Sequence, residues 1–166
     1  MTTVDNSLTT IRPALGLILW IGLCLTAASI GSLLTVPAIP VWYQTLAKPV
    51  WTPPSWLFAP VWTVLYLMMG TAAWLVWRPG GWMGAPVALG WFLVQLALNI
   101  AWSGLFFKLR MPGLAFLEIV VLWLAIVATL WWFARYSAPA AWLLTPYLAW
   151  VTFAAVLNLS IWRMNR

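Results

Sequence analysis

Five long apolar runs, separated by short polar stretches, set the pattern of this 166-residue chain. Charged residues stand singly between the runs, which cover about residues 13–36, 54–77, 85–107, 113–133 and 140–162. Each run is long enough to cross a bilayer as an α-helix, which takes roughly 20 apolar residues. The pattern therefore predicts an all-α membrane protein, a five-transmembrane-helix bundle.

The composition agrees with this pattern, because the chain is 65% hydrophobic and 6% charged, with a mean hydropathy of +0.98. A soluble domain of this size cannot bury so much apolar surface. We therefore expect residues 13–166 to form one transmembrane domain preceded by an N-terminal extension, residues 1–12. The first run is longer than the apolar core of a signal peptide, so we expect it to be retained as a span.

The connection between the first two runs is unusually long for a compact domain, at about twenty residues, and such loops are often lids or binding elements. It leads into the stretch KPVWTPPSWLFAPVWTVLY, residues 48–66. Pro49, Pro53 and Pro54 bias the residues before them away from helix and stiffen an extended segment. We therefore expect this loop to cap an internal pocket.

The formal net charge is +6. The basic residues are scattered singly at the ends of the runs, which is typical of interfacial anchors and excludes a basic stripe for nucleic acid. With five spans, Arg12, Arg78 and Arg135 share one side of the membrane. The other side has Lys48, Lys108, Arg110, Arg163 and Arg166. The positive-inside rule then predicts a cytoplasmic C terminus.

Tryptophan is abundant, with sixteen copies. Those near span ends fit an aromatic belt at the membrane interface. Deeper ones share a helix face with polar or small residues: Trp62 with Tyr66, Trp102 with Gln95 and Asn99, and Trp150 with Ala154 and Asn158. The spacing also predicts that Trp91 lies on the same stripe as Trp102. Polar groups in a span must face the bundle interior, because lipid cannot satisfy them.

Two interpretations of these faces remain open. They converge on an aromatic, sparsely polar cavity that suits a flat, largely apolar ligand. Alternatively, Gln95, Asn99 and Asn158 only join helices to one another.

Residues for conventional catalysis or metal binding are scarce. The chain has no histidine and one cysteine, Cys24, so we expect no metal site and no acid–base catalysis. Glu118 is the only acid in a span. It is either a proton relay or counter-charge, or an acid stabilised near a helix N-terminus close to Lys108 and Arg110.

Three sequence motifs together resemble those of the translocator protein family, the bacterial tryptophan-rich sensory proteins and their mitochondrial relatives. They are the stretch at 48–66, QLALNIAWSGLFF at 95–107 and PYLAWVTFAAVLNLSIWRMN at 146–165. The resemblance implies a five-helix bundle, often a homodimer, whose internal pocket is capped by the first long loop. It also implies a bacterial cell membrane as the location.

The resemblance further implies a receptor or sensor that needs no cofactor and binds porphyrins, such as protoporphyrin IX or heme, as ligands. The implied ligand-binding residues are Tyr43, Pro53, Trp62, Asn99, Trp102, Trp150 and Ala154. The alternative functions are a tetrapyrrole or sterol transporter, or an enzyme that degrades porphyrin with light and oxygen. Trp62 and Trp150 are the candidates for that catalysis. Loss of porphyrin absorption on illumination would indicate turnover, and flux across proteoliposomes would indicate transport.

Two further expectations concern partners. The family's sterol motif has a tyrosine where this chain has Leu159, so we do not expect sterol binding at that site. Ala97 and Ala101, four residues apart, allow close helix approach and predict a dimer through the third helix.

Overall fold

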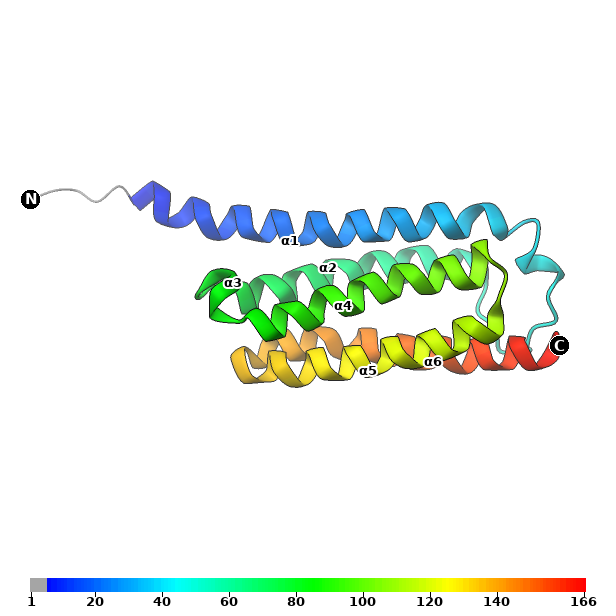
Figure 1. The fold of residues 1–166 in the computed structure, drawn as a ribbon. Helices are drawn as coiled ribbons and strands as arrows, with labels where there is room; N and C mark the ends of the chain where they lie inside the picture. Colours follow the sequence, from blue (N-terminus) through cyan, green and yellow to red (C-terminus); the bar gives the residue numbers. More distant parts are fainter. Residues whose placement is uncertain (1–5) are drawn as a thin grey trace, which may run out of the picture.

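The computed structural model describes residues 6–166, with side chains described from residue 14 onward. Every regular element in this part of the chain is helical, which confirms the predicted all-α fold. The α-helices are α1 (Asn6–Thr35), α2 (Phe58–Trp77), α3 (Gly81–Gly84), α4 (Pro86–Ser103), α5 (Pro112–Tyr136) and α6 (Ala138–Met164) (Figure 1). Helix α1 begins inside the segment 1–12 expected as an N-terminal extension, of which residues 1–5 lie outside the described residues.

Five helical segments are long and apolar enough to cross a membrane, as predicted, so the chain is a multi-pass membrane protein. They are Ala14–Ala38, Ser55–Trp77, Pro86–Lys108, Pro112–Tyr136 and Ala138–Met164. The sequence predicted a longer connection between the last two. Instead, Ser137 alone joins α5 to α6, because its N–H donates to the carbonyl of Phe133 (2.8 Å) and its hydroxyl accepts from the N–H of Ala140 (3.4 Å). One serine thus ends one helix and caps the next.

The five spanning helices form a closed ring. Each packs most extensively against two neighbours, in the cyclic order α1, α2, α6, α5, α4, and α2 also touches α4 across the ring. Figure 1 shows α3 at one end of this ring, with the long loop between α1 and α2 and the C terminus at the other. We call residues 36–57 the capping loop and this end of the ring the loop end. A ring of helices encloses a central space, which side chains either fill or leave as a cavity.

In the half of the ring nearest α3, side chains fill the centre. Phe92 of α4 and Phe133 of α5 stack with their ring centroids 5.8 Å apart. Met69 of α2 and Leu144 of α6 are buried beside them in the same hydrophobic cluster. Lipid tails are as apolar as these side chains, so close packing rather than removal from water stabilises this half.

Helices α1 and α2 approach each other closely at Gly70. A Cβ atom placed on Gly70 would lie 2.8 Å from the Cα of Ile21 and 3.0 Å from its backbone nitrogen. Only a residue without a side chain permits this separation, which is how small residues act at helix contacts in membranes. Gly70 therefore sets the distance between the two helices on the α3 side.

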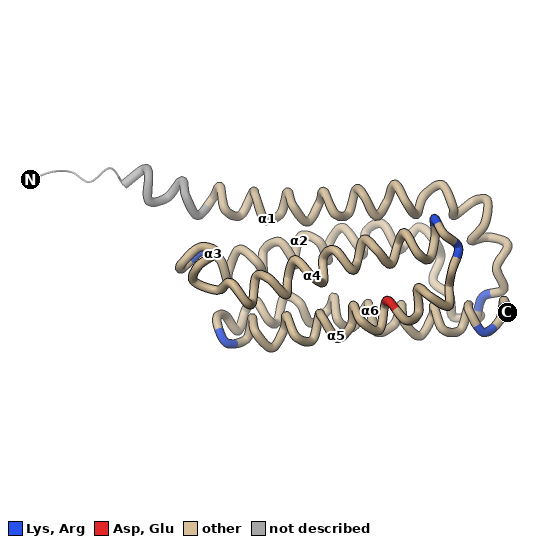
Figure 2. Tube along the Cα trace, viewed as in Figure 1, with Lys and Arg blue, Asp and Glu red and all other residues tan. Residues whose placement is uncertain are grey.

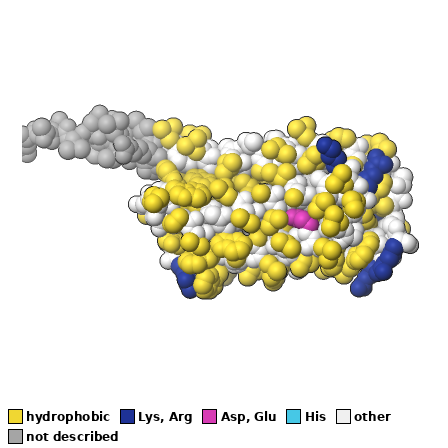
Figure 3. All heavy atoms as spheres, viewed as in Figure 1, with side chains coloured by type: hydrophobic (Ala, Val, Ile, Leu, Met, Phe, Trp, Pro, Cys, Tyr) yellow, Lys and Arg dark blue, Asp and Glu magenta, His cyan; other side chains and the backbone are white. Residues whose placement is uncertain are grey.

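Basic residues lie at the two ends of the bundle (Figure 2), and hydrophobic side chains cover much of the face between them (Figure 3). Several of these cations lie over indole rings: the Arg135 guanidinium is 3.5 Å from the centroid of the Trp131 ring, and that of Arg166 is 5.0 Å from Trp162. Such contacts suit a membrane interface, where a cation and an aromatic ring both meet water.

We expect Gly70→Ala to destabilise the bundle by about 1–3 kcal/mol, because the added methyl group must displace the α1 backbone. Gly22→Ala is the matched control, since its Cβ would meet no neighbouring atom within 4 Å. The control should be neutral, or stabilising by up to about 1 kcal/mol, because alanine favours helix. Thermal unfolding in detergent, followed by tryptophan fluorescence, compares the two variants, and equal stabilities would contradict the close contact.

Candidate functional site

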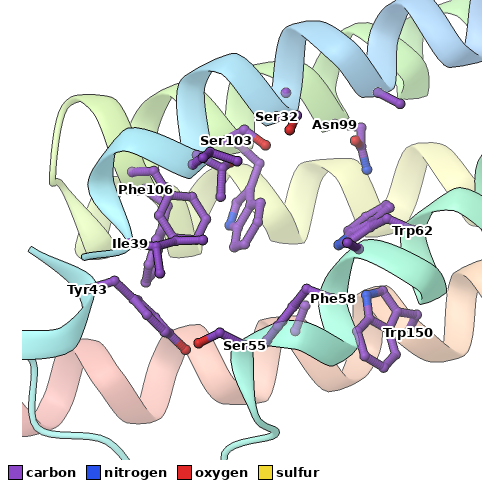
Figure 4. A pocket seen from close by; sticks show the side chains of 18 of the residues that line it. Ser32, Ile39, Tyr43, Ser55, Phe58, Trp62, Asn99, Ser103, Phe106 and Trp150 are labelled. Carbon is purple, nitrogen blue, oxygen red and sulfur yellow. The ribbon is translucent and has the colours of Figure 1, made fainter. Parts of the chain in front are cut away.

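The half of the ring at the loop end encloses a cavity of about 540 Å³. Side chains from α1, α2, α4, α6 and the capping loop converge on it (Figure 4). Of the residues expected to bind a ligand, those that line the cavity are Tyr43, Trp62, Asn99, Trp102, Trp150 and Ala154. Pro53 does not line it, because the chain is extended at Pro54 and Ser55 is the residue that reaches the cavity.

One wall comes from α2 and α6. Phe58 and Trp62 lie four residues apart on α2, as do Trp150 and Ala154 on α6, so each pair projects from one face of its helix. The ring of Phe58 meets that of Trp150 edge-on, with centroids 6.0 Å apart. Neither the Trp62 nor the Trp150 indole N–H has a hydrogen bond within the described part of the chain. This wall therefore offers flat apolar surface and two free donors.

Trp102 is held differently. Its indole N–H donates to Oδ1 of Asn158 (3.0 Å), and Nδ2 of Asn158 donates to the carbonyl of Pro112 (2.7 Å). Its ring stacks on Phe106, with centroids 5.4 Å apart. These contacts fix the plane of the Trp102 ring and connect α4 to α6 and α5. Trp102 thus supplies a fixed surface with its hydrogen-bond donor already used.

A chain of buried polar groups crosses the ring beside the cavity. The Tyr66 hydroxyl donates to Oδ1 of Asn99 (2.6 Å), Nδ2 of Asn99 donates to the Tyr147 hydroxyl (3.1 Å), and that hydroxyl donates to Oε1 of Gln95 (2.9 Å). Tyr66 and Asn99 line the cavity, whereas Gln95 does not. Both interpretations of the amides therefore hold in part: all three of them join helices, and Asn99 and Asn158 also face the cavity.

The sequence predicted that Trp91 shares the inward face of α4 with Asn99 and Trp102, and this prediction is wrong. The Trp91 side chain is 39% exposed on the outside of the bundle. Its neighbour Phe92, which is fully buried, takes the central position at that level. Helical spacing alone cannot show which of two adjacent large side chains faces inward.

The capping loop covers the cavity at its end and is fastened there. Tyr43 is buried against Phe106 and Phe107, and burial raises the pKa of its phenol above the ordinary value. The Lys48 ammonium donates to the carbonyl oxygens of Tyr43 (2.7 Å) and Leu46 (3.0 Å), which folds the loop on itself.

Asn165, beyond the end of α6, fastens the loop to the bundle. Its Oδ1 accepts from the N–H of Ala47 (2.9 Å) and its Nδ2 donates to the carbonyl of the same residue (2.9 Å). A single side-chain amide thus pairs with both backbone groups of one residue. The capping loop is therefore closed in this structure.

Charge is excluded from the cavity. No charged residue is among the described residues that line it, and the described chain contains no group of three or more His, Cys, Asp or Glu that could hold a metal ion. Glu118 lies outside the lining, and its carboxylate oxygens are buried without a hydrogen-bond partner among the described residues, Lys108 and Arg110 included. The cavity can therefore hold an apolar body by contact and by neutral hydrogen bonds.

The sequence analysis missed the contribution of α1. Leu25, Ser29 and Ser32 line the cavity from this helix. Small and aliphatic residues of this kind are common throughout an apolar span, so their spacing gives no signal. Phe106 and Phe107 were also missed, and they reach the cavity from a turn of π-helix, Gly104–Lys108, that follows α4.

We expect Tyr147→Phe to destabilise the protein by about 1–3 kcal/mol, because Asn99 and Gln95 each lose a buried hydrogen bond. Tyr136→Phe removes the same atom from an exposed side chain at the end of α5 and should change stability by less than about 0.5 kcal/mol. Thermal unfolding of both variants in detergent measures the difference. Equal stabilities would show that the polar chain does not hold the helices together.

Comparison with known proteins places the chain in a family. Residues 20–163 match the TspO/MBR family. The tryptophan-rich protein TspO of Chlorobaculum tepidum is 48% identical over 155 residues, which are 93% of this chain and 98% of the relative. The translocator protein of Ovis aries is 45% identical over 127 residues, 75% of each chain. The tryptophan-rich sensory protein of Cereibacter sphaeroides is 37% identical over 124 residues, 75% of this chain and 77% of the relative. The chain therefore belongs to the TspO/MBR family.

Proposed function

We propose that this protein is a membrane receptor or sensor that binds flat apolar tetrapyrroles, such as protoporphyrin IX or heme, in the cavity at the loop end. The observation that carries the proposal is a cavity of about 540 Å³ whose described lining has no charged residue and whose wall includes the rings of Trp62 and Trp150. The names of the relatives, which include a sensory protein and translocator proteins, support the same class of function.

The dimensions and the lining of the cavity suit such a ligand. Its volume lies within the range of about 300–1,000 Å³ that small-molecule sites occupy. Aromatic side chains stack on a flat ring system, and each such contact contributes about 0.5–1.5 kcal/mol beyond the area buried. The indole N–H groups of Trp62 and Trp150, which have no hydrogen bond in the described part of the chain, can donate to a ring nitrogen or a carbonyl oxygen of the ligand.

Charge distribution fixes the orientation of the ligand in this proposal. Burying a carboxylate without a charged partner is costly, and the described lining has no cation. The acidic substituents of a porphyrin therefore lie at the exposed edge of the cavity nearest the loop end, where the lining residues Val36 and Ser55 are exposed. Basic residues lie at that end (Figure 2), and Lys108 and Arg110 belong to the segment between α4 and α5.

The same charges give the orientation in the membrane that we propose. The loop end has Lys48 in the capping loop, Lys108 and Arg110 between α4 and α5, and Arg163 and Arg166 at the end of α6. The other end has Arg78 after α2 and Arg135 at the end of α5. Positive residues favour the cytoplasmic side. The loop end and the C terminus thus face the cytoplasm of a bacterial cell.

Titration with protoporphyrin IX in detergent should quench tryptophan fluorescence in a saturable way. The double variant Trp62→Ala, Trp150→Ala should bind about tenfold or more weakly, because it loses two aromatic contacts at the cavity wall. The double variant Trp56→Ala, Trp142→Ala is the control, since these side chains are 71% and 74% exposed and do not line the cavity. Absence of saturable quenching, or equal affinity of the two double variants, would reject the proposed site.

We also propose that the outer face of α4 forms a homodimer contact. Gly90, Val94, Ala97 and Ala101 follow one another along this face, and Val94, Ala97 and Ala101 are exposed. A stripe of small residues lets a second helix approach closely in a bilayer.

Crosslinking tests the dimer. We expect Ala97→Cys to give a covalent dimer on oxidation in native membranes, whereas Leu124→Cys, on an exposed position of α5, should not. The native Cys24 is buried and should not interfere. Equal crosslinking at both positions, or at neither, would contradict a specific contact through α4.

A further inference from the structure

The exposed part of the cavity lining is confined to one side. Every lining residue that is exposed belongs to α1, to α2 or to the turns that adjoin them, and the set includes Ser29, Ser32, Val36, Ser55, Ala59 and Thr63. The lining residues from α4, α6 and the π-helical turn are buried or half-buried. A side chain that both faces the cavity and is exposed marks a place where the cavity reaches the surface. The cavity therefore opens between α1 and α2.

The register of the two helices locates this opening. On the α3 side they are in contact, because a Cβ on Gly70 would meet the backbone of Ile21 and one on Gly16 would meet the ring of Trp77. Antiparallel helices rise equally per residue, so this register continues to place Ser32 opposite Ala59. Beyond this pair, Val36 and Ser55 lie in the 3₁₀ turns that join the capping loop to the two helices. These are the exposed lining residues. The helices thus touch along one half of their length, and an elongated opening, the slot, separates them along the other half.

The slot lies at membrane depth. Ser29 and Thr63 are inside the spans Ala14–Ala38 and Ser55–Trp77. The Ser29 hydroxyl donates to the carbonyl of Leu25 (2.9 Å) and that of Thr63 to the carbonyl of Ala59 (2.9 Å), each within its own helix. These two rim hydroxyls are therefore satisfied without a partner across the slot. An apolar molecule that passes between them breaks no hydrogen bond of theirs.

The capping loop offers a costlier route. Opening it separates Asn165 from both backbone groups of Ala47 and disturbs the carbonyl oxygens that surround the Lys48 ammonium. Backbone groups freed at that point have to find new partners. The loop end is thus fastened, whereas the side toward α1 and α2 is open.

We infer that the cavity exchanges its ligand directly with the bilayer, through the slot between α1 and α2 and not past the capping loop. This inference rests on the proposed function and adds the source of the ligand to it: an apolar molecule already dissolved in the membrane. Ser32 and Ala59 are rim residues, and Asn165 holds the other end shut.

Two reversible crosslinks distinguish the routes. One joins Ser32→Cys to Ala59→Cys across the slot, and the other joins Ala47→Cys to Asn165→Cys across the loop contact, each with a cleavable bifunctional thiol reagent. All four native positions are exposed, and Cys24 is buried. The protein is held in proteoliposomes, protoporphyrin IX is supplied from donor vesicles, and the rate of tryptophan quenching reports exchange.

The slot crosslink should slow exchange by about tenfold or more, and cleavage of the reagent should restore the rate. The loop crosslink should leave exchange within about twofold of the protein with native Ala47 and Asn165, because the reagent replaces the fastening that Asn165→Cys removes. Slower exchange with the loop crosslink overturns the inference. Unchanged exchange with both crosslinks overturns it as well. Equilibrium titration of the unlinked protein tests the proposed function separately, and absence of binding there rejects both.

A substitution supplies an independent kinetic test. Thr63→Phe places a large ring at the rim, and Thr145→Phe places one on α6, at another exposed threonine bonded to its own helix that does not line the cavity. An obstacle on the path slows association and dissociation by the same factor, so Thr63→Phe should reduce both rates and Thr145→Phe neither. A change in equilibrium affinity without slower exchange would show that Thr63 only shapes the cavity.

Discussion

Hydrogen bonds between helices hold the hollow half of this bundle in shape. In lipid a polar side chain has only other protein groups as partners, and here those partners lie across the ring. Tyr66, Asn99, Tyr147 and Gln95 connect α2, α4 and α6, while Trp102 and Asn158 connect α4, α6 and the start of α5. Close packing does the corresponding work in the other half, around Phe92 and Phe133. The cavity exists where directional contacts replace close packing.

The tryptophans take different roles according to what their N–H groups meet. Trp131 and Trp162 lie under arginine side chains at the ends of the bundle, where a belt residue belongs. Trp102 has its donor occupied by Asn158 and serves as a fixed surface. Trp62 and Trp150 keep theirs free at the cavity wall. The contacts of each indole thus separate the tryptophans into interfacial anchors, fixed cavity walls and candidate ligand contacts.

The sequence predicted what depends on period and length. Five apolar runs require five spans, and four-residue spacing places Trp62 and Tyr66 on one face of α2 whatever surrounds that helix. It did not predict features that depend on neighbours. Trp91 and Phe92 are adjacent and similar in size, and only packing shows which one faces the centre. The family resemblance placed Pro53 among the ligand-binding residues, but the extended backbone brings Ser55 to the cavity instead. The part of the lining that α1 provides had no pattern to find, because small side chains occur on every side of that helix.

The absence of charge from the described cavity lining has a consequence for energetics in a living membrane. A transmembrane voltage acts on charges, at about 2.3 kcal/mol per elementary charge for each 100 mV crossed. Neutral amides, hydroxyls and indoles contribute almost nothing to that coupling. Occupancy of this cavity therefore responds to the electrical state of the cell only through whatever charge the bound molecule itself carries.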